Sequence, residues 1–135
     1  MTGLVVCAVV LAAASAFGLL RQRRDGRVKV QDGEKVLGAR ELGDRLGERA
    51  TLVQFSSAFC QPCRATRRVL ADVAGLVPGV AHIEIDAEEH LALVRELGIL
   101  KTPTVLVLDK AGRIVRRAAG QPRKADVIAA LGEAV

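Results

Sequence analysis

The sequence predicts an α/β domain preceded by one apolar helix, and two observations carry this prediction. Apolar, β-like runs at residues 51–56 and 80–85 are each followed by a segment whose apolar residues recur at helical spacing. This alternation of strand and helix implies parallel strands joined by right-handed crossovers. Ahead of them, residues 3–20 are uncharged and consist mostly of Ala, Val and Leu. A chain of 135 residues has room for one ordinary domain and a short appendage.

The N-terminal segment 3–20 is just long enough to cross a membrane. As a helix it spans about 27 Å, against a hydrocarbon core of about 30 Å. A cleaved signal peptide is the competing interpretation, because Ala14-Ser15-Ala16 resembles a cleavage site. A signal peptide, however, carries positive charge before its apolar stretch. Here the charge follows it, in Arg21, Arg23, Arg24, Arg27 and Lys29.

This basic flank sets the expected topology and localisation. By the positive-inside bias, basic residues stay in the cytoplasm. We therefore expect a single-pass anchor and flank (residues 1–25) and a cytoplasmic domain (residues 26–135), with an extracytoplasmic or secreted domain as the alternative. The flank contributes much of the net charge of +5 but has no interleaved aromatic residues. It is interpreted as touching lipid headgroups, and no nucleic-acid partner is expected.

The first half of the domain contains three predicted elements. Residues 27–30 alternate like a short edge strand, and Asp32-Gly33 is typical of a turn. Residues 39–46 form a weak helix, because they include a glycine at position 43. The segment 64–77 is predicted to be a helix that Pro78-Gly79 ends. Its expected buried stripe is Val69, Leu70, Val73, Leu76 and Val77.

The second half is predicted to add a helix, a hairpin and a closing helix. Asp86 and Glu89 resemble a capping box for the helix after the 80–85 strand, and Gly98 gives that helix a left-handed end. Residues 104–108 and 113–116 pair across a turn at 109–112. The last helix begins at about Pro122. The expected buried faces are Leu91, Val94 and Leu97 in the first of these helices, and Val127, Ile128 and Leu131 in the last.

Two cysteines stand where the 51–56 strand gives way to a helix. Cys60 and Cys63 are three residues apart, so their side chains share one helix face and their sulfurs can close a disulfide. Unpaired N–H groups and the helix dipole converge on Cys60 and stabilise its thiolate. Cys60 is then the predicted nucleophile, and Cys63 resolves the mixed disulfide. Pro62 suits an early helical position.

Other uses of this cysteine pair fit the sequence less well. A structural zinc site needs four ligands, and no second Cys pair or closely spaced His pair accompanies the two thiols; His82 and His90 are given no special role. A c-type haem is excluded because Arg64, not His, follows Cys63. No nucleotide, flavin or metal motif is visible. We expect no cofactor, so that electrons arrive from another protein or from a small thiol.

Thr102-Pro103, just before the 104–108 strand, has two interpretations. An X-Pro bond adopts cis at a cost of only about 0.5–1 kcal/mol. A cis bond here could present the backbone of Thr102 to an extended substrate. Equally, a proline is tolerated at the first position of a strand.

Together these residues resemble the thioredoxin family over most of residues 26–135. The resemblance rests on Leu-Val-Gln-Phe at 52–55, Phe-Cys-Gln-Pro-Cys-Arg at 59–64, Ile-Glu-Ile-Asp at 83–86, Leu-Gly-Ile at 97–99, Thr-Pro-Thr at 102–104 and Gly120. It implies a central mixed β-sheet flanked by helices, with Pro103 as a cis-proline beside the cysteines. It further implies a substrate-binding groove formed by Phe59, Gln61, Pro62, Thr102, Pro103 and Gly120.

Four residues near the cysteines depart from the family pattern, among them Ser56, which stands where a second Trp is common. Phe59 and Gln61 replace the usual Trp and Gly, and Gln54 stands where an Asp is usually buried beneath the second cysteine. An amide neither accepts nor releases a proton near neutrality, so Gln54 lacks the carboxylate's role in deprotonating Cys63. Arg64, on the helix, could support the Cys60 thiolate.

The leading functional hypothesis is a membrane-tethered dithiol/disulfide oxidoreductase that acts on protein disulfides in cell redox homeostasis. The alternative is a binding module with the same fold and weak or no redox turnover, which the unusual Gln54 and the absence of Trp keep open. A peroxidase is a weaker third hypothesis, because no Thr and Arg pair is placed to polarise a peroxide.

Overall fold

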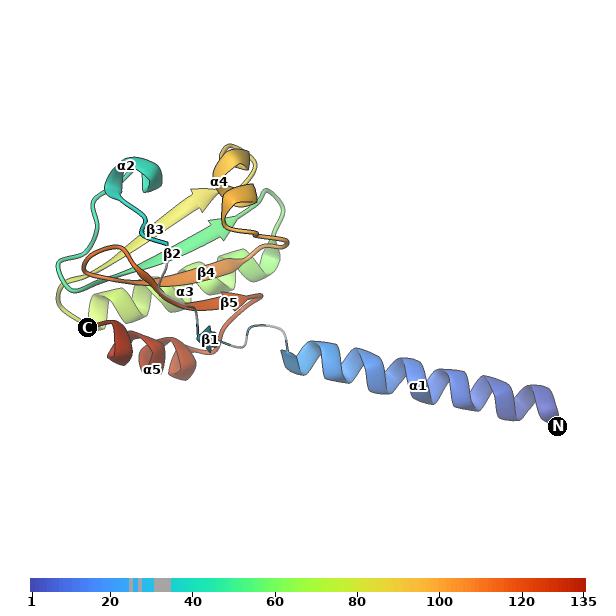
Figure 1. Ribbon diagram of the computed structural model, residues 1–135. Helices are drawn as coiled ribbons and strands as arrows, with labels where there is room; N and C mark the ends of the chain where they lie inside the picture. The colour runs from blue at the N-terminus through green and yellow to red at the C-terminus, as the bar shows by residue number, and fades with distance from the viewer. Residues whose placement is uncertain (25, 27, 31–34) are drawn as a thin grey trace.

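The computed structural model describes residues 1–24, 26, 28–30 and 35–135, and Figure 1 presents it. Its elements, in chain order, are α1 (Thr2–Arg24), β1 (Val28–Val30), α2 (Ala39–Leu42), β2 (Ala50–Ser56), α3 (Gln61–Leu76), β3 (Val80–Asp86), α4 (Leu91–Glu96), β4 (Thr104–Asp109), β5 (Ile114–Ala119) and α5 (Lys124–Ala134). The predicted turn at Asp32-Gly33 and the predicted strand start at Arg27 lie outside the described residues.

The strands form one mixed sheet in the order β1-β5-β4-β2-β3. β2 and β3 are parallel, as the crossover pattern predicted, whereas β4 runs antiparallel to β2 and β5 antiparallel to β4. β1 pairs with β5 at the sheet edge, so the predicted edge strand is confirmed over Val28–Val30. Because β4 is antiparallel to β2, Thr104 at its start pairs with Phe55 near the end of β2. The loop before β4 is thereby brought to the end of the sheet where Cys60 lies.

Apolar side chains cover both faces of the central strands. One core contains Val53, Phe55 and Ile83 with residues of α2 and the 97–99 segment. The other contains Leu52 and Val105 with residues of α3 and α5. Neighbouring β2 residues point to opposite faces, so all seven residues of the strand are buried. In Figure 1, α3 and α5 lie together against one face of the sheet.

Helix α1 stands apart from the domain and has no buried residues (Figure 1). The helix is 23 residues long and contains an 18-residue stretch with a mean hydropathy of 2.5, so it is long and apolar enough to cross a membrane. A signal sequence near an N-terminus meets the same criteria. The predicted apolar helix is therefore present and somewhat longer than the 3–20 segment.

The predicted end of α2 and the predicted start of α4 were wrong. The 39–46 helix ends at Leu42, because Gly43 adopts a left-handed conformation with φ of 74°. The capping box after β3 does not form: the Asp86 carboxylate accepts from the N–H of Glu88 at 2.9 Å, within a turn. α4 starts only at Leu91, after His90.

Three side chains predicted to be buried are exposed. They are Leu76 (66 %), Leu91 (54 %) and Ile128 (45 %). Leu76 is the last residue of α3, and Leu91 is the first residue of α4. On α5, small side chains at Ala130 and Ala134 complete the buried face in place of Ile128.

Candidate active site around Cys60 and Cys63

The two cysteines form a disulfide at the start of α3. Their Sγ atoms are 2.03 Å apart and their Cα atoms 5.2 Å apart. The helix begins at Gln61, earlier than the predicted Arg64, so Cys60 is the N-cap residue and its Sγ accepts from the Cys63 N–H at 3.2 Å. Cys60 is partly exposed, whereas Cys63 is only 2 % exposed. One sulfur of the pair therefore faces the surface and the other faces the protein interior.

The helix N-terminus favours negative charge on Cys60. α3 is 16 residues long, and its first turn contains no acidic residue. Its unpaired N–H groups and its dipole both stabilise a thiolate at the N-cap. Pro62 occupies the first helical turn, as predicted, where its missing N–H costs no hydrogen bond. The Arg64 side chain is exposed, and among the described residues no hydrogen bond or ion pair holds that side chain against Cys60.

The residue before Cys60 projects fully into solvent. Phe59 has a φ of 60°, uncommon for a residue other than glycine, and its side chain is 103 % exposed. This conformation turns the ring outward instead of into the core. Phe59 is thus an apolar surface next to the exposed sulfur.

The loop before β4 completes one wall of a groove. The Thr102-Pro103 peptide bond is cis, which decides between the two interpretations of this dipeptide. The Thr102 and Ser57 hydroxyls are 2.7 Å apart, and the N–H of Gly120 donates to the Pro103 carbonyl at 2.8 Å. Pro62, Thr102, Pro103 and Gly120 all line a cavity of about 720 Å³. Gln61 is exposed at the start of α3.

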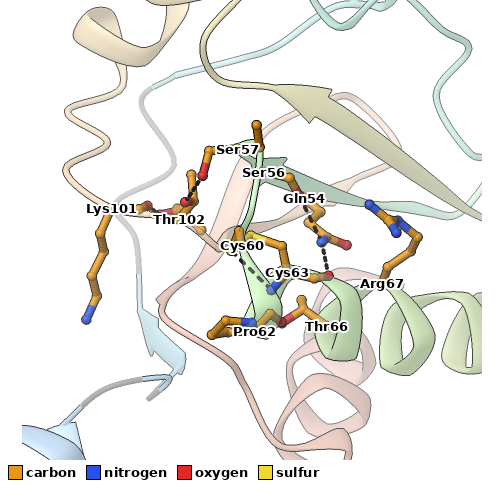
Figure 2. Close-up of a disulfide and its surroundings, with 12 residues drawn as sticks. Gln54, Ser56, Ser57, Cys60, Pro62, Cys63, Thr66, Arg67, Lys101 and Thr102 are labelled. Carbon is orange, nitrogen blue, oxygen red and sulfur yellow. Dashed lines mark hydrogen bonds between the residues drawn. A yellow bond between two sulfur atoms is a disulfide. The ribbon is translucent and has the colours of Figure 1, made fainter.

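Gln54 is completely buried beneath the second cysteine, as the family resemblance implied. Its Nε2 donates to the Cys63 carbonyl at 2.8 Å and to the Ser56 Oγ at 3.0 Å (Figure 2). Its Oε1 lies 3.2 Å from Nε2 of His82. All of its hydrogen-bonding atoms are therefore engaged, and the amide ties the first turn of α3 to the sheet.

The network continues to the surface through Glu84. The Ser56 hydroxyl donates to Glu84 Oε2 at 3.1 Å, and Arg67 Nε donates to both carboxylate oxygens at 2.9 and 3.0 Å. Arg67, a half-exposed side chain of α3, is thereby paired with β3.

Sequence reasoning missed His82 and Glu84 as parts of the site. In the β2–β3 register, Glu84 lies opposite Gln54 and His82 opposite Leu52. Both residues alternate along β3 with the buried Ile83 and Ile85. That alternation was the available signal, since it puts the two polar side chains on the same sheet face as Gln54.

Partial burial lowers the pKa of His82 below its ordinary value; Glu84 opposes this shift, and Arg67 lowers the pKa further. The imidazole is therefore neutral near neutral pH. Because Gln54 uses its NH₂ group on Cys63 and Ser56, its oxygen faces His82. His82 accordingly donates from Nε2, which assigns the tautomer. Within the described parts of the chain, no three His, Cys, Asp or Glu residues are grouped to hold a metal.

A mixed sheet flanked by helices, with a partly exposed cystine at a helix N-terminus beside a cis-proline, defines a thiol-disulfide oxidoreductase. The family model for a thioredoxin-like domain matches residues 44–135, and the chain belongs to the thioredoxin family.

Individual relatives agree with this assignment. The chain is 32 % identical over 122 residues to putative thioredoxin H10 of Arabidopsis thaliana, covering 85 % of this chain and 75 % of that one. It is 32 % identical over 96 residues to a thioredoxin of Mycolicibacterium smegmatis, covering 68 % and 85 %. Among solved structures, the short form of thioredoxin F from spinach chloroplast is similar in fold, with a TM-score of 0.57 at 22 % identity and coverage of 65 % and 78 %.

The neutral His82 predicts a pH dependence of stability. Its pKa in the folded state lies below the unfolded value of about 6.5, so between these values the unfolded chain binds more protons. The contribution of His82 is thus complete above pH ~6.5 and decreases as the pH falls towards the folded pKa. Urea unfolding of the full chain in mild detergent should give a lower free energy of unfolding at pH ~5.5 than at pH ~7.5. His82→Gln, which can still donate to Gln54, should reduce this difference.

His90→Gln is the matched control, because His90 lies on the exposed N-cap of α4 and does not contact Gln54. It should keep the pH dependence of the wild type. If His82→Gln keeps the pH dependence of the wild type, then the lower free energy of unfolding at acidic pH comes from groups other than His82.

Proposed function

We propose that the chain is a membrane-anchored protein-disulfide reductase in which Cys60 is the nucleophile and Cys63 the resolving thiol. The observation that carries the proposal is the asymmetry of the pair: Cys60 is partly exposed at the N-cap of α3, and Cys63 is buried one turn further on. An attacking thiolate needs access and a positive electrostatic environment, and a resolving thiol needs shielding until the mixed disulfide forms.

The reaction proceeds in two exchanges. The Cys60 thiolate attacks one sulfur of a substrate disulfide; a bond from Sγ to that sulfur forms, the substrate S–S bond breaks, and the released thiolate takes up a proton. The Cys63 thiol then loses its proton and attacks Cys60 Sγ. This step forms the Cys60–Cys63 disulfide and releases the second substrate thiol. Two electrons pass to the substrate, and a dithiol donor returns them to the enzyme.

The residues around the pair suggest how a substrate is held. An extended segment can lie along the groove formed by Pro62, Thr102, Pro103 and Gly120. The apolar ring of Phe59 then contacts the side of the segment nearest Cys60. The groove is lined by prolines and Gly120 together with the longer side chains of Lys101, Arg123 and Lys124. We expect it to accept many extended sequences, with the accessibility of the disulfide as the main requirement.

Exchange activity is tested with serine variants of the full chain on a Cys7→Ser background, which removes the free cysteine of α1. With dithiothreitol as donor, the parent should reduce insulin catalytically. Cys60→Ser should abolish turnover and form no adduct, whereas Cys63→Ser should accumulate a mixed disulfide that non-reducing electrophoresis detects. Parent protein without turnover would reject the reductase and favour the binding-module alternative. Adduct formation by Cys60→Ser would reverse the two roles.

Gln54 is proposed to slow the resolving step, because its amide occupies the position where a buried carboxylate could accept the Cys63 proton. Burial would raise the pKa of a carboxyl at this position towards neutrality, which suits a general base. Gln54→Asp should therefore increase insulin turnover by about ten-fold. It should also cost about 1–3 kcal/mol of stability, because the Cys63 carbonyl and the Ser56 hydroxyl lose their donor.

Gln54→Leu is the control for this substitution, since it removes the same donor without adding a base. Stopped-flow reduction kinetics should show a faster rate in the Asp variant alone. If Gln54→Asp reduces disulfides no faster than the wild type, then proton transfer at position 54 does not limit the rate.

The domain, residues 26–135, is proposed to lie in the cytoplasm on an uncleaved anchor formed by residues 1–25. In support, the basic residues of α1 all lie in its last turn, at Arg21, Arg23 and Arg24. A reducing glutathione poise of roughly −220 to −320 mV would then maintain the dithiol form. In intact cells the full-length chain should remain in the membrane fraction and resist external protease. Digestion without permeabilisation, or a soluble chain cleaved after Ala16, would overturn this topology.

A further inference from the structure

The junction between the anchor and the domain is fixed beside the active-site groove. The N–H of Gly26, two residues after the end of α1, donates to the Ala119 carbonyl at 2.7 Å. Gly26 is buried, and its φ is 75°. A Cβ at this position would approach the Gln121 carbonyl oxygen to 2.0 Å, so only glycine fits. The contact residues Ala119 and Gln121 flank Gly120, which hydrogen-bonds to Pro103 in the groove.

Two adjoining cavities connect the end of α1 with the groove. A cavity of about 710 Å³ is lined by Leu20, Arg23 and Arg24 of α1 together with Gly26. The groove cavity of about 720 Å³ is lined by Gln22 of α1 together with Pro103. The two cavities share Gln22, Gln121 and Arg123 as walls. In Figure 1, α1 extends from the end of the domain at which β2 passes into α3.

The level of a membrane surface follows from where the apolar part of α1 stops. Its last apolar residue is Leu20, and charged residues begin at Arg21. Leu20 itself lines the first cavity. If the apolar part spans the bilayer, the headgroup layer lies at this cavity, and the groove beside it opens next to the headgroups.

The charge around the junction matches an anionic surface. The side chains that line the two cavities include five cations, Arg23, Arg24, Lys101, Arg123 and Lys124, among the residues described. Asp126 is the one acidic residue in these linings within the described part of the chain, and it pairs with Arg123 at 3.2 Å. Lys and Arg close to a membrane surface are attracted to anionic lipid headgroups.

We propose that the domain sits on anionic lipid headgroups with the groove lined by Pro62, Pro103 and Gly120 at the membrane surface. Its preferred substrates are then disulfides in membrane-adjacent segments of other membrane proteins. This inference rests on the proposed function, both as reductase and as anchored protein. The basic surface formed by the five cations holds the orientation, and the Gly26 contact keeps the point where the chain enters the domain beside the groove. A disulfide far above the bilayer meets the groove less often than one at headgroup level.

The test compares two disulfide peptides in vesicles of phosphatidylcholine and phosphatidylglycerol that carry the full chain. Each peptide is attached to a lipid; in one the disulfide directly follows the lipid, and in the other a long flexible Gly/Ser spacer separates them. With dithiothreitol as donor, the wild type should reduce the near peptide at least about ten-fold faster than the distant one. The preference should fall at high salt and in vesicles of phosphatidylcholine alone, because both weaken headgroup attraction.

Variants separate a fixed orientation from a simple tether. Gly26→Ala should remove the near-peptide preference when both peptide rates are normalised to the variant's own insulin reduction, since the added Cβ would displace Gln121 next to Gly120. Gly43→Ala is the matched control, because Gly43 has a similar φ of 74° but no atom within 4 Å of the position that a Cβ would take, and it lies away from the junction. It should keep the preference. As a second variant, a Gly/Ser segment inserted after Arg24 should abolish the preference with Gly26 intact.

The outcomes distinguish this inference from the function on which it rests. Equal rates on the two peptides, or a preference retained in both Gly26→Ala and the insertion variant, would overturn the fixed orientation while insulin reduction still supports the enzyme. Failure to reduce insulin would overturn the proposed function itself, and failure to remain with the vesicles would overturn the anchor.

Discussion

The position of β2 between β3 and β4 determines how the site is assembled. β2 pairs in parallel with β3 and antiparallel with β4, and its seven residues are all buried. Its end therefore meets the carboxyl end of β3 and the start of β4. Cys60 follows β2, and the cis-Pro103 loop precedes β4, so these two strand pairings bring the sulfur and the groove wall together. Neither feature would face the other if β4 were parallel.

The polar network below Cys63 depends on the same register. Gln54 is fully buried within a largely apolar strand, a position at which an unpaired amide would cost about 1–3 kcal/mol. Hydrogen bonds to Cys63, Ser56 and His82 remove that cost. Among the described residues, no buried side-chain polar atom lacks a partner. The network is thus structurally complete with an amide where a carboxylate would introduce a buried charge.

An amide in place of a carboxylate at position 54 affects the reactivity of the two cysteines. Gln54 positions the first turn of α3 through the Cys63 carbonyl but supplies no proton acceptor. The neutral His82 orients the amide, and the Glu84–Arg67 ion pair encloses the network on its solvent side. Stabilisation of the Cys60 thiolate is left to the helix N-terminus, which is independent of these groups. The environment of Cys60 is therefore set by the helix N-terminus, whereas that of Cys63 is set by the hydrogen bonds of Gln54.

Elements whose signals are local could be predicted from the amino-acid sequence. The Cys-Gln-Pro-Cys spacing, the apolar runs of β2 and β3, and the uncharged segment of α1 each carry their information within a few residues, so the redox pair and the order of elements were accessible. Helix ends were less accurate, because Gly43 and the Asp86 turn compete with continued helical hydrogen bonding. The cis state of Pro103, the partners of Gln54 and the contact of Gly26 with Ala119 emerge only in the folded chain. These features depend on strand pairing and packing between distant segments, and no short stretch of sequence specifies which distant segment will be its neighbour.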